Sequence, residues 1–188
     1  VIFLKSLDTS DNWTVYVGAE GNTKAMFLNL TNAKTTSSTY WNNTSPTPSV
    51  FSLGNDTQVN KTGDDFIAYC FHSVEGYSST DTYYKGNGNA DGSFIYTGFR
   101  PAYVLIKDID AVEAWEVWDN KRDPYNVTSI KLSPNTSDGD YTANETTYAI
   151  DFLSNGFKLR TTYSAVNATN DFLYYAIAKS PFKTSRAR

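Results

Sequence analysis

The chain has 188 residues, of which 40% are hydrophobic, 15% aromatic and only 19% charged, a composition whose Tyr, Phe, Thr, Asn and Gly are typical of strands and turns. The net charge of −4 provides no basic field for phosphates, so we expect no nucleic-acid binding. The single Cys excludes an intrachain disulfide and a cysteine zinc site, and no apolar run approaches the roughly 20 residues of a membrane helix, so we expect no membrane insertion.

The first strand predicted in the chain belongs to a segment that recurs. Three pairs of segments align at nearly constant spacing, the first two at an offset of 102 and the third, after a four-residue insertion, at 106. They are VIFLKSLDTSDNWTVY (1–16) with YVLIKDIDAVEAWEVW (103–118), LNLT (28–31) with IKLS (130–133), and DDFIAYCF (64–71) with NDFLYYAI (170–177). Two constant offsets separated by one insertion predict a tandem repeat.

The repeat predicts two domains, a first copy at residues 1–76 and a second at residues 77–188. The first copy is incomplete at its N-terminus, because it has no counterpart of residues 77–102. The chain also starts without Met, inside an apparent strand, so we expect a fragment of a longer or processed polypeptide, or a sheet that another segment completes. An unpaired sheet edge at that place would favour association.

The second copy alternates short apolar runs with turn clusters that contain Gly, Asn, Asp and Pro, a pattern typical of a small antiparallel β-domain. The strands that we predict are 81–85, 93–98, 102–108, 114–119, 128–132, 147–152, 156–160 and 171–178. Two of these runs, FLYYAIA and AYVLI, are apolar on both faces, as central strands of a two-layer sandwich are. The predicted fold is an all-β antiparallel sandwich of jelly-roll or concanavalin-like type, present as tandem copies.

The most glycine-rich motif is GNGNADG at residues 86–92. A dinucleotide loop needs the spacing G-x-G-x-x-G before a helix, whereas this motif has G-x-G-x-x-x-G before an apparent strand. A calcium loop fits better through Asn87, Asn89 and Asp91, but Gly98 stands where a bidentate Glu is needed. We therefore predict an Asn/Gly turn, with no metal site and no cofactor.

Two further groups of residues invite a catalytic interpretation. Cys70 and His72 lie nearly 7 Å apart along one predicted strand, too far for a direct nucleophile–base bond, so we predict a packed thiol and a histidine at the rim. EAWEVWD (113–119) resembles the acid-rich strands of sandwich-fold glycosidases, but Glu116 and Asp119 point to opposite faces of a strand. We predict no catalytic residues and no enzymatic activity.

The candidate ligand-binding residues lie in turns. Trp41 and Tyr125 have rings that could stack on a sugar, although packing against the protein is the favoured interpretation for each. The loops that we expect to be displayed are 41–48, 86–92, 120–126 and 135–145. The candidate residues within them are Trp41, Asn87, Asn89, Asp91, Lys121, Arg122 and Tyr125.

Several motifs occur in an order that resembles a known family. They are IAYCFHSVEGYS, YKGNGNADGSFIYTGFRPAYVLIK, WDNKRDPYN, DFLSNGFKLRTT and PFKTSRAR. Together they resemble a repeated domain of unknown biochemical function in virion and fibre-like proteins of tailed phages, especially marine phages and cyanophages. The resemblance implies a concanavalin-like β-sandwich on the outside of a virion, and it implies no catalytic residues.

The leading functional hypothesis is therefore a non-enzymatic structural and adhesion module of a phage particle, in a tail fibre, spike or head-decoration protein. Its expected partners are other virion proteins, further copies of itself, with a trimer as one arrangement, and host-surface polysaccharide as a candidate ligand. One alternative is a carbohydrate-active enzyme that uses Glu116 or Asp119. Another is a glycosylated extracellular binding protein of a eukaryote or its virus, because the chain has ten N-x-S/T sequons.

Overall fold

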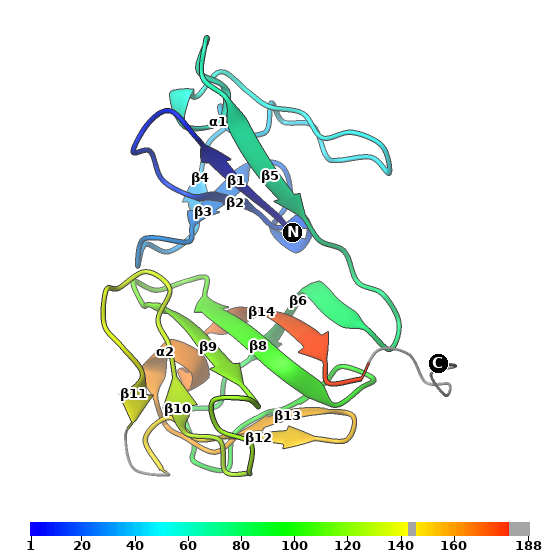
Figure 1. Cartoon of the computed structure of the whole chain (residues 1–188), viewed down its shortest axis with the longest axis vertical. Helices are drawn as coiled ribbons and strands as arrows, with labels where there is room; N and C mark the ends of the chain where they lie inside the picture. The colour runs from blue at the N-terminus through cyan, green and yellow to red at the C-terminus, as the bar shows by residue number, and fades with distance from the viewer. Residues whose placement is uncertain (143–145, 181–188) are drawn as a thin grey trace. The chain divides into compact units, whose positions relative to one another are not determined.

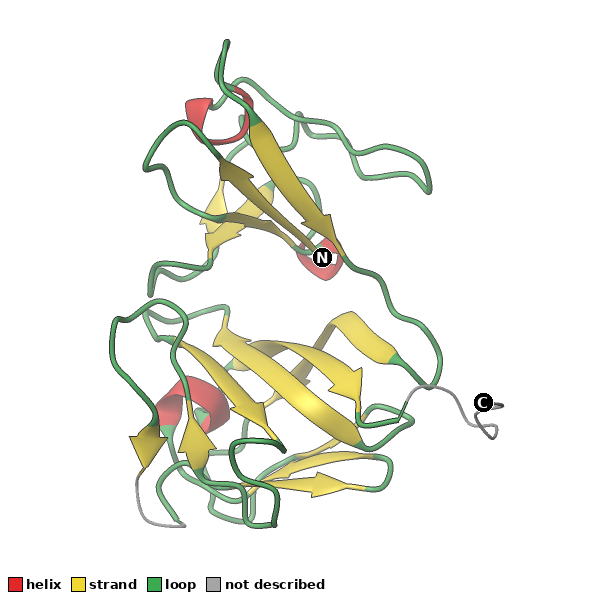
Figure 2. Ribbon diagram, viewed as in Figure 1, coloured by secondary structure: helices red, strands yellow, loops and turns green. Residues whose placement is uncertain are grey.

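The computed structural model describes residues 1–142 and 146–180, in which antiparallel strands predominate (Figures 1 and 2). The predicted all-β class with antiparallel sheets is confirmed. The chain divides into two compact units, Val1–Phe71 (unit 1) and His72–Arg188 (unit 2), five residues before the boundary expected from the repeat. Among the described residues, none of the helices has the length and apolar character that crossing a membrane requires.

Unit 1 is built on one five-stranded sheet with the order β4-β3-β2-β1-β5. Its elements are β1 (Ile2–Ser6), β2 (Thr14–Tyr16), a 3-10 turn (Gly18–Glu20), β3 (Lys24–Phe27), β4 (Thr35–Thr36), α1 (Thr57–Asn60) and β5 (Phe66–Cys70). Alternate residues of β1, Ile2 and Leu4, enter a core with Tyr16 and Trp41. Asp56 caps α1, because its Oδ1 accepts a hydrogen bond from the Gln58 N–H at 2.9 Å.

Unit 2 contains a four-stranded sheet, β6-β14-β8-β9, a three-stranded sheet, β12-β13-β7, and the β10-β11 pair. Its elements are β6 (Ser78–Lys85), β7 (Phe94–Tyr96), β8 (Pro101–Asp108), β9 (Trp115–Asp119), β10 (Ile130–Lys131), β11 (Tyr141–Thr142), β12 (Ile150–Leu153), β13 (Gly156–Leu159), α2 (Ser164–Asn167) and β14 (Asp171–Ala178). The two larger sheets form two layers (Figure 2), and one core cluster takes residues from both.

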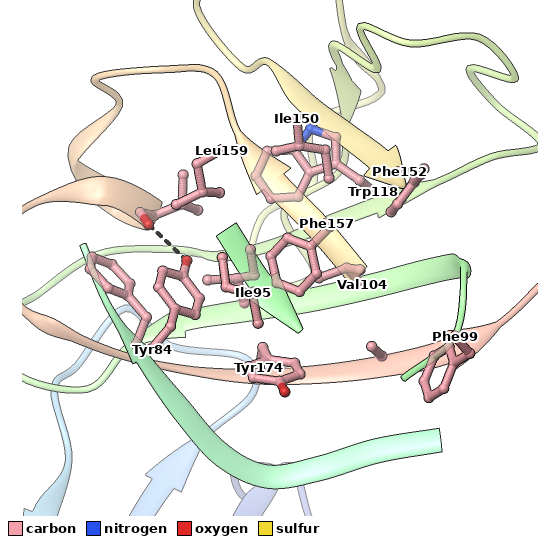
Figure 3. Packing of buried hydrophobic residues seen from close by; sticks show 14 of the residues in the cluster. Tyr84, Ile95, Phe99, Val104, Trp118, Ile150, Phe152, Phe157, Leu159 and Tyr174 are labelled. Atoms are coloured by element: carbon pink, nitrogen blue, oxygen red, sulfur yellow. Dashed lines mark hydrogen bonds between the residues drawn. The ribbon is translucent and has the colours of Figure 1, made fainter. Parts of the chain in front are cut away.

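Both larger sheets contribute aromatic side chains to the core of unit 2 (Figure 3). Tyr84 of β6 stacks on Phe172 with ring centroids 5.2 Å apart, and Phe157 meets Tyr174 edge-on at 5.5 Å. The Tyr84 hydroxyl donates to the Val166 carbonyl at 2.7 Å, the bond drawn as a dashed line in Figure 3. A buried phenol with a backbone acceptor keeps its polar group satisfied while its ring packs.

The burial of Tyr84 leads to a prediction at alkaline pH. Burial, followed by the charge of Asp108, raises the pKa of this phenol well above 10.0. The pKa of Tyr84 is higher in the folded protein than in the unfolded chain. The contribution of the neutral phenol to the free energy of unfolding is therefore complete below a pH of about 10, and it is lost as pH rises towards the folded-state pKa. In denaturant titrations above that pH, Tyr84→Phe should reduce the slope of unfolding free energy against pH by about 1.4 kcal/mol per unit.

Tyr125→Phe is the matched control, because Tyr125 is 80% exposed, and this variant should keep the wild-type slope. An unchanged slope in Tyr84→Phe would contradict the prediction.

The central strands of the two units pair in matching register. Ile2 lies opposite Cys70 in unit 1, and Val104 lies opposite Ala176 in unit 2, at the offsets of 102 and 106 found in the sequence. Every β1–β5 pair has its β8–β14 counterpart at these offsets, as does every β1–β2 pair in β8–β9. The lysine side chains at the ends of β1 and β8 match as well: Lys5 and Lys107 each donate to the carbonyl of the next residue at 2.6 Å.

The third strand departs from the predicted alignment. Met26 pairs with β2 and Leu132 bridges to β9, so these two residues are related by an offset of 106. The pairs β3–β4 and β10–β11 have the same offset. The insertion therefore lies before β3, and the alignment of residues 28–31 with 130–133 is wrong by four residues.

The expectation of a packed thiol at Cys70 is also wrong, because Cys70 is exposed. The residue aligned with it, Ala176, is 0% exposed under the second sheet of unit 2. Among its described strands unit 1 has a single sheet, in which β5 is an edge strand (Figure 1), so no second sheet of unit 1 covers the face on which Cys70 lies. His72 is exposed, and its Nδ1 lies 2.9 Å from the Ser73 carbonyl oxygen.

Candidate functional site

The 86–92 loop closes on itself through its own side chains. Asn87 Oδ1 accepts from the Asn89 N–H at 2.9 Å, and Asn89 Oδ1 accepts from the Asp91 N–H at the same distance. Asn87 Nδ2 donates to the Asp91 carbonyl at 3.0 Å. These are the local amide bonds of an Asn turn, and they occupy the oxygens that a calcium ion would need.

Asn167 of α2 fixes this loop to the rest of unit 2. Its side chain is 0% exposed; Nδ2 donates to the carbonyls of Asn89 at 2.8 Å and Thr161 at 2.7 Å, and Oδ1 accepts from the Asn87 N–H at 3.0 Å. Gly86 allows the close approach, because a Cβ there would lie 1.9 Å from the Ala168 carbonyl oxygen. Gly86 therefore serves a close contact between backbones, whereas Gly88 adopts a positive φ of 67°.

Asp91 extends from the loop into solvent, where its carboxylate contacts Lys158 of β13 and Arg160, the residue directly after β13. Its carboxylate lies 2.8 Å from Lys158 Nζ and 3.6 Å from the Arg160 guanidinium. The hydrogen bond and charge of Lys158 lower the pKa of Asp91. In residues 1–142 and 146–180, no cluster of three or more His, Cys, Asp or Glu is arranged to hold a metal ion.

Trp41 lies in the core of unit 1 and is 1% exposed. Its Nε1 donates to the Lys24 carbonyl at 2.9 Å, and its ring meets Tyr16 edge-on at 5.3 Å. A ring covered in this way has no free face on which a sugar could stack, so the packing interpretation of Trp41 is the one that fits.

The 120–126 loop combines an anchored arginine with a displayed tyrosine. Arg122 lies between Asp119 at 2.8 Å and Asp140 at 2.9 Å, and Asp119 Oδ1 also accepts from the N–H groups of Lys121 and Arg122. Tyr125 is 80% exposed, so its ring remains a candidate contact for a ligand. In the neighbouring candidate loop, residues 143–145 lie outside the described part of the chain.

Glu116 belongs to a buried polar cluster that the sequence did not predict. Its Oε2 lies 2.7 Å from Lys131 Nζ and accepts from Ser133 Oγ at 2.9 Å, while Oε1 accepts from the Tyr163 hydroxyl at 2.7 Å. The Glu116 and Lys131 side chains are 0% and 2% exposed. Burial, with the charge and hydrogen bond of Glu116, raises the pKa of the Tyr163 phenol well above its ordinary value.

Three tyrosine rings surround the Lys131 ammonium. Nζ lies 4.0 Å from the ring centre of Tyr141, 4.6 Å from that of Tyr148 and 5.3 Å from that of Tyr163. Such rings stabilise a desolvated cation by cation–π attraction. Because the ammonium and the Glu116 carboxylate are satisfied by one another and shielded from solvent, this cluster stabilises the junction of β9, β10 and α2, and neither group is presented to a substrate.

A surface pocket of about 340 Å³ opens beside this cluster. It is bounded by three segments: the 86–92 loop, the residues before β12 and the residues after β13. Its lining is Ala90, Thr146, Thr147, Arg160, Thr161, Thr162 and Tyr163. The lining carries the hydroxyl groups of four threonines and one tyrosine together with Arg160, whose Nε is paired with the Asp151 carboxylate at 2.6 Å.

The fold and this site define an antiparallel β-protein with a hydroxyl-rich surface pocket on its second unit. A family model described as a domain of unknown function, DUF7483, matches residues 1–181, so the chain belongs to this family. No curated protein and no solved structure matches the chain.

Two signals in the sequence could have indicated the missed groups. Lys131 lies between the apolar residues Ile130 and Leu132 of a predicted strand, and a lysine at such a position needs an internal partner when the strand is covered. The second signal is the threonine-rich flank of β12 and β13, in which Thr146, Thr147, Thr161 and Thr162 occur as two pairs. The contact between these segments depends on β12 pairing with β13, and the Asn155-Gly156 turn between the two strands is the signal for that hairpin.

Proposed function

We propose that the chain is a non-enzymatic structural and adhesion module of a phage particle, which binds host-surface polysaccharide through unit 2. The phage assignment rests on the order of motifs in the sequence. The observation that carries the binding role is the hydroxyl-rich pocket beside the 86–92 loop. A rigid sandwich that displays such a site can add many weak contacts through multivalency on a particle.

We also propose that the two units are tandem copies of one domain, and that the complete copy is a jelly-roll sandwich of the concanavalin-like type. Support comes from the shared register of β1, β2 and β5 with β8, β9 and β14. The β3–β4 and β10–β11 pairs add an independent match at one further constant offset. Chance placement of unrelated strands would not preserve both offsets and pairing.

The non-enzymatic role is supported by the state of the two carboxylates that a glycosidase would need. Glu116 is buried against Lys131, and Asp119 is bonded to Arg122 and the following backbone. The extracellular eukaryotic alternative is not supported at the sequon of Asn167, whose buried side chain already donates to two carbonyls. A glycan at that position would require the loss of both bonds.

The virion location is tested by mass spectrometry of purified particles, in which the protein should be present in several copies. Its oligomeric state, a trimer or another assembly with virion proteins, follows from the mass of the native complex. A monomeric protein that is absent from particles would overturn the proposal.

The pocket is tested by filling it. Thr162 is exposed at its rim, so Thr162→Trp should leave the fold intact and weaken binding of purified host-surface polysaccharide at least about tenfold, a loss of about 1.4 kcal/mol. Calorimetry with the polysaccharide measures this change. Thr62→Trp, at an exposed turn of unit 1, is the matched control and should bind as the wild type does. Equal affinity in the two variants would remove the pocket from the proposal.

A further inference from the structure

Among the described strands, the sheet of unit 1 ends at β5, which has a strand partner on one side only. Val1 and Phe71 exchange both of their backbone hydrogen bonds, at 2.8 and 2.9 Å, and β1 pairs with β5 along its whole length. Because bonding direction alternates along an antiparallel strand, odd-numbered residues of β5 point to β1, and Phe66, Ala68 and Cys70 point their N–H and C=O groups away from it. These groups form a free edge that can accept another strand.

The corresponding strand of unit 2 is paired on both sides. β14 lies between β8 and β6, and its even-numbered residues bond to β6, as the bond from the Gly86 N–H to the Asn170 carbonyl shows. Tyr174 and Ala176 are 3% and 0% exposed there. Their counterparts in β5, Ala68 and Cys70, are exposed. In the part of the chain that the structure describes, unit 1 thus has no strand in the place that β6 takes beside β14.

We propose that the free edge of β5 binds an extended polypeptide segment with the sequence character of residues 77–99, which completes the sheet of unit 1 by strand addition. This inference rests on the proposal that the two units are copies of one domain. The occupant is defined by its chemistry: a strand of small hydroxyl residues and tyrosines like β6, followed by an Asn/Gly turn and an apolar strand like β7.

Charge complementarity supports this occupant. Lys85 of β6 lies 3.5 Å from the carboxylate of Asp171 at the start of β14. The residue that corresponds to Asp171 in unit 1 is Asp65, which is exposed beside the free edge. A lysine at the position of Lys85 would meet Asp65 in the same register, so the edge selects the direction and alignment of the incoming strand.

Unit 1 also has a residue, Asn60, that could bind the turn that follows a β6-like strand. Asn167 holds the 86–92 loop of unit 2, and Asn60 is its counterpart in side-chain bonding, because both residues donate from Nδ2 to a carbonyl six residues earlier. Asn60 is exposed and makes this bond to Gly54 at 2.9 Å. Its amide is placed to receive the loop of an added segment as Asn167 receives its own.

Cys70 supplies a direct probe, because it is the single cysteine of the chain and lies on the free edge. The experiment adds a synthetic peptide of residues 77–99 to the full chain and measures the rate at which a thiol reagent modifies Cys70. We expect saturating peptide to slow the reaction at least about tenfold, because the β7-like part of the added segment would cover the thiol as the second sheet of unit 2 covers Ala176.

Two variants test the geometry of the added strand. A peptide carrying Thr82→Pro lacks the backbone donor that faces the partner strand and should give no protection, and this comparison leaves the protein unchanged. Ala68→Pro in the protein removes a donor of the free edge while sparing the bonds to β1, and it too should lose protection.

Three results would overturn the proposal: an unchanged Cys70 rate at about 1 mM peptide, equal protection by the Thr82→Pro peptide, or protection that grows with protein concentration alone. The last result would assign the edge to a second copy of the chain. The readout involves neither polysaccharide nor particles, so failure here is distinct from failure of the adhesion proposal.

Discussion

Lys131→Met is expected to lower the free energy of unfolding of unit 2 by about 3–5 kcal/mol, because it leaves the Glu116 carboxylate buried without its cation. The hydrogen bonds from Ser133 and Tyr163 remain, but they do not neutralise the charge. The variant also removes the ammonium from the three tyrosine rings around it. Urea titration followed by tryptophan fluorescence measures the change.

The double variant Glu116→Gln with Lys131→Met should recover most of this loss, since it removes both charges and keeps an amide whose oxygen accepts from one hydroxyl while its NH2 donates to the other. Lys85→Met is the matched control, because its ion pair with Asp171 is largely exposed, and it should cost less than about 1 kcal/mol. If Lys131→Met cost no more than Lys85→Met, the cluster would not have the structural role assigned to it.

Unit 1 gives an independent reason to expect this recovery. The residues that correspond in strand register to Glu116 and Lys131 are Thr14 and Ala25, and both are buried. Trp41 packs in the same core, with its indole nitrogen bonded to the backbone of β3. The same strand pairing is therefore compatible with uncharged side chains at these two positions. Unit 2 requires only that the charges of Glu116 and Lys131 be present or absent together.

The strands that the sequence predicted well are long, apolar and bounded by turns. Strands predicted at 102–108 and 171–178 correspond to β8 and β14 within one residue, because burial on both faces makes their apolar runs continuous. β6 begins three residues earlier than predicted, in the polar run SSTD, where pairing with β14 extends the strand beyond its apolar part. β11 and α2 were not predicted, since two to four residues carry no measurable periodicity.

The site was less predictable because its parts meet only through tertiary packing. Glu116, Lys131 and Tyr163 lie on separate elements, and nothing in their spacing brings them together. The prediction for Cys70 failed for a different reason. Its position on a strand was predicted correctly, but burial depends on what covers a strand, and the described part of unit 1 has no second sheet over β5. An alignment of the two segments therefore predicts strand register more reliably than it predicts the burial of a side chain.

Asn167→Ala is expected to lower the free energy of unfolding of unit 2 by about 2–4 kcal/mol, because it leaves two carbonyls and one N–H without their buried partner. The loss should be concentrated at the 86–92 loop, which the Asn167 side chain joins to α2. Hydrogen exchange of the Asn87 and Asn89 amides measures this local effect, and chemical denaturation measures the global one.

Asn60→Ala is the control that separates the role of this side chain from a general helix effect. Asn60 ends α1 as Asn167 ends α2, but it is exposed and donates one bond, to Gly54, so its replacement should cost less than about 1 kcal/mol. Similar losses in the two variants would mean that the amide acts only within its own turn. A larger loss for Asn167, with faster exchange confined to the loop, would establish that the glycine-rich motif is held as a structural turn.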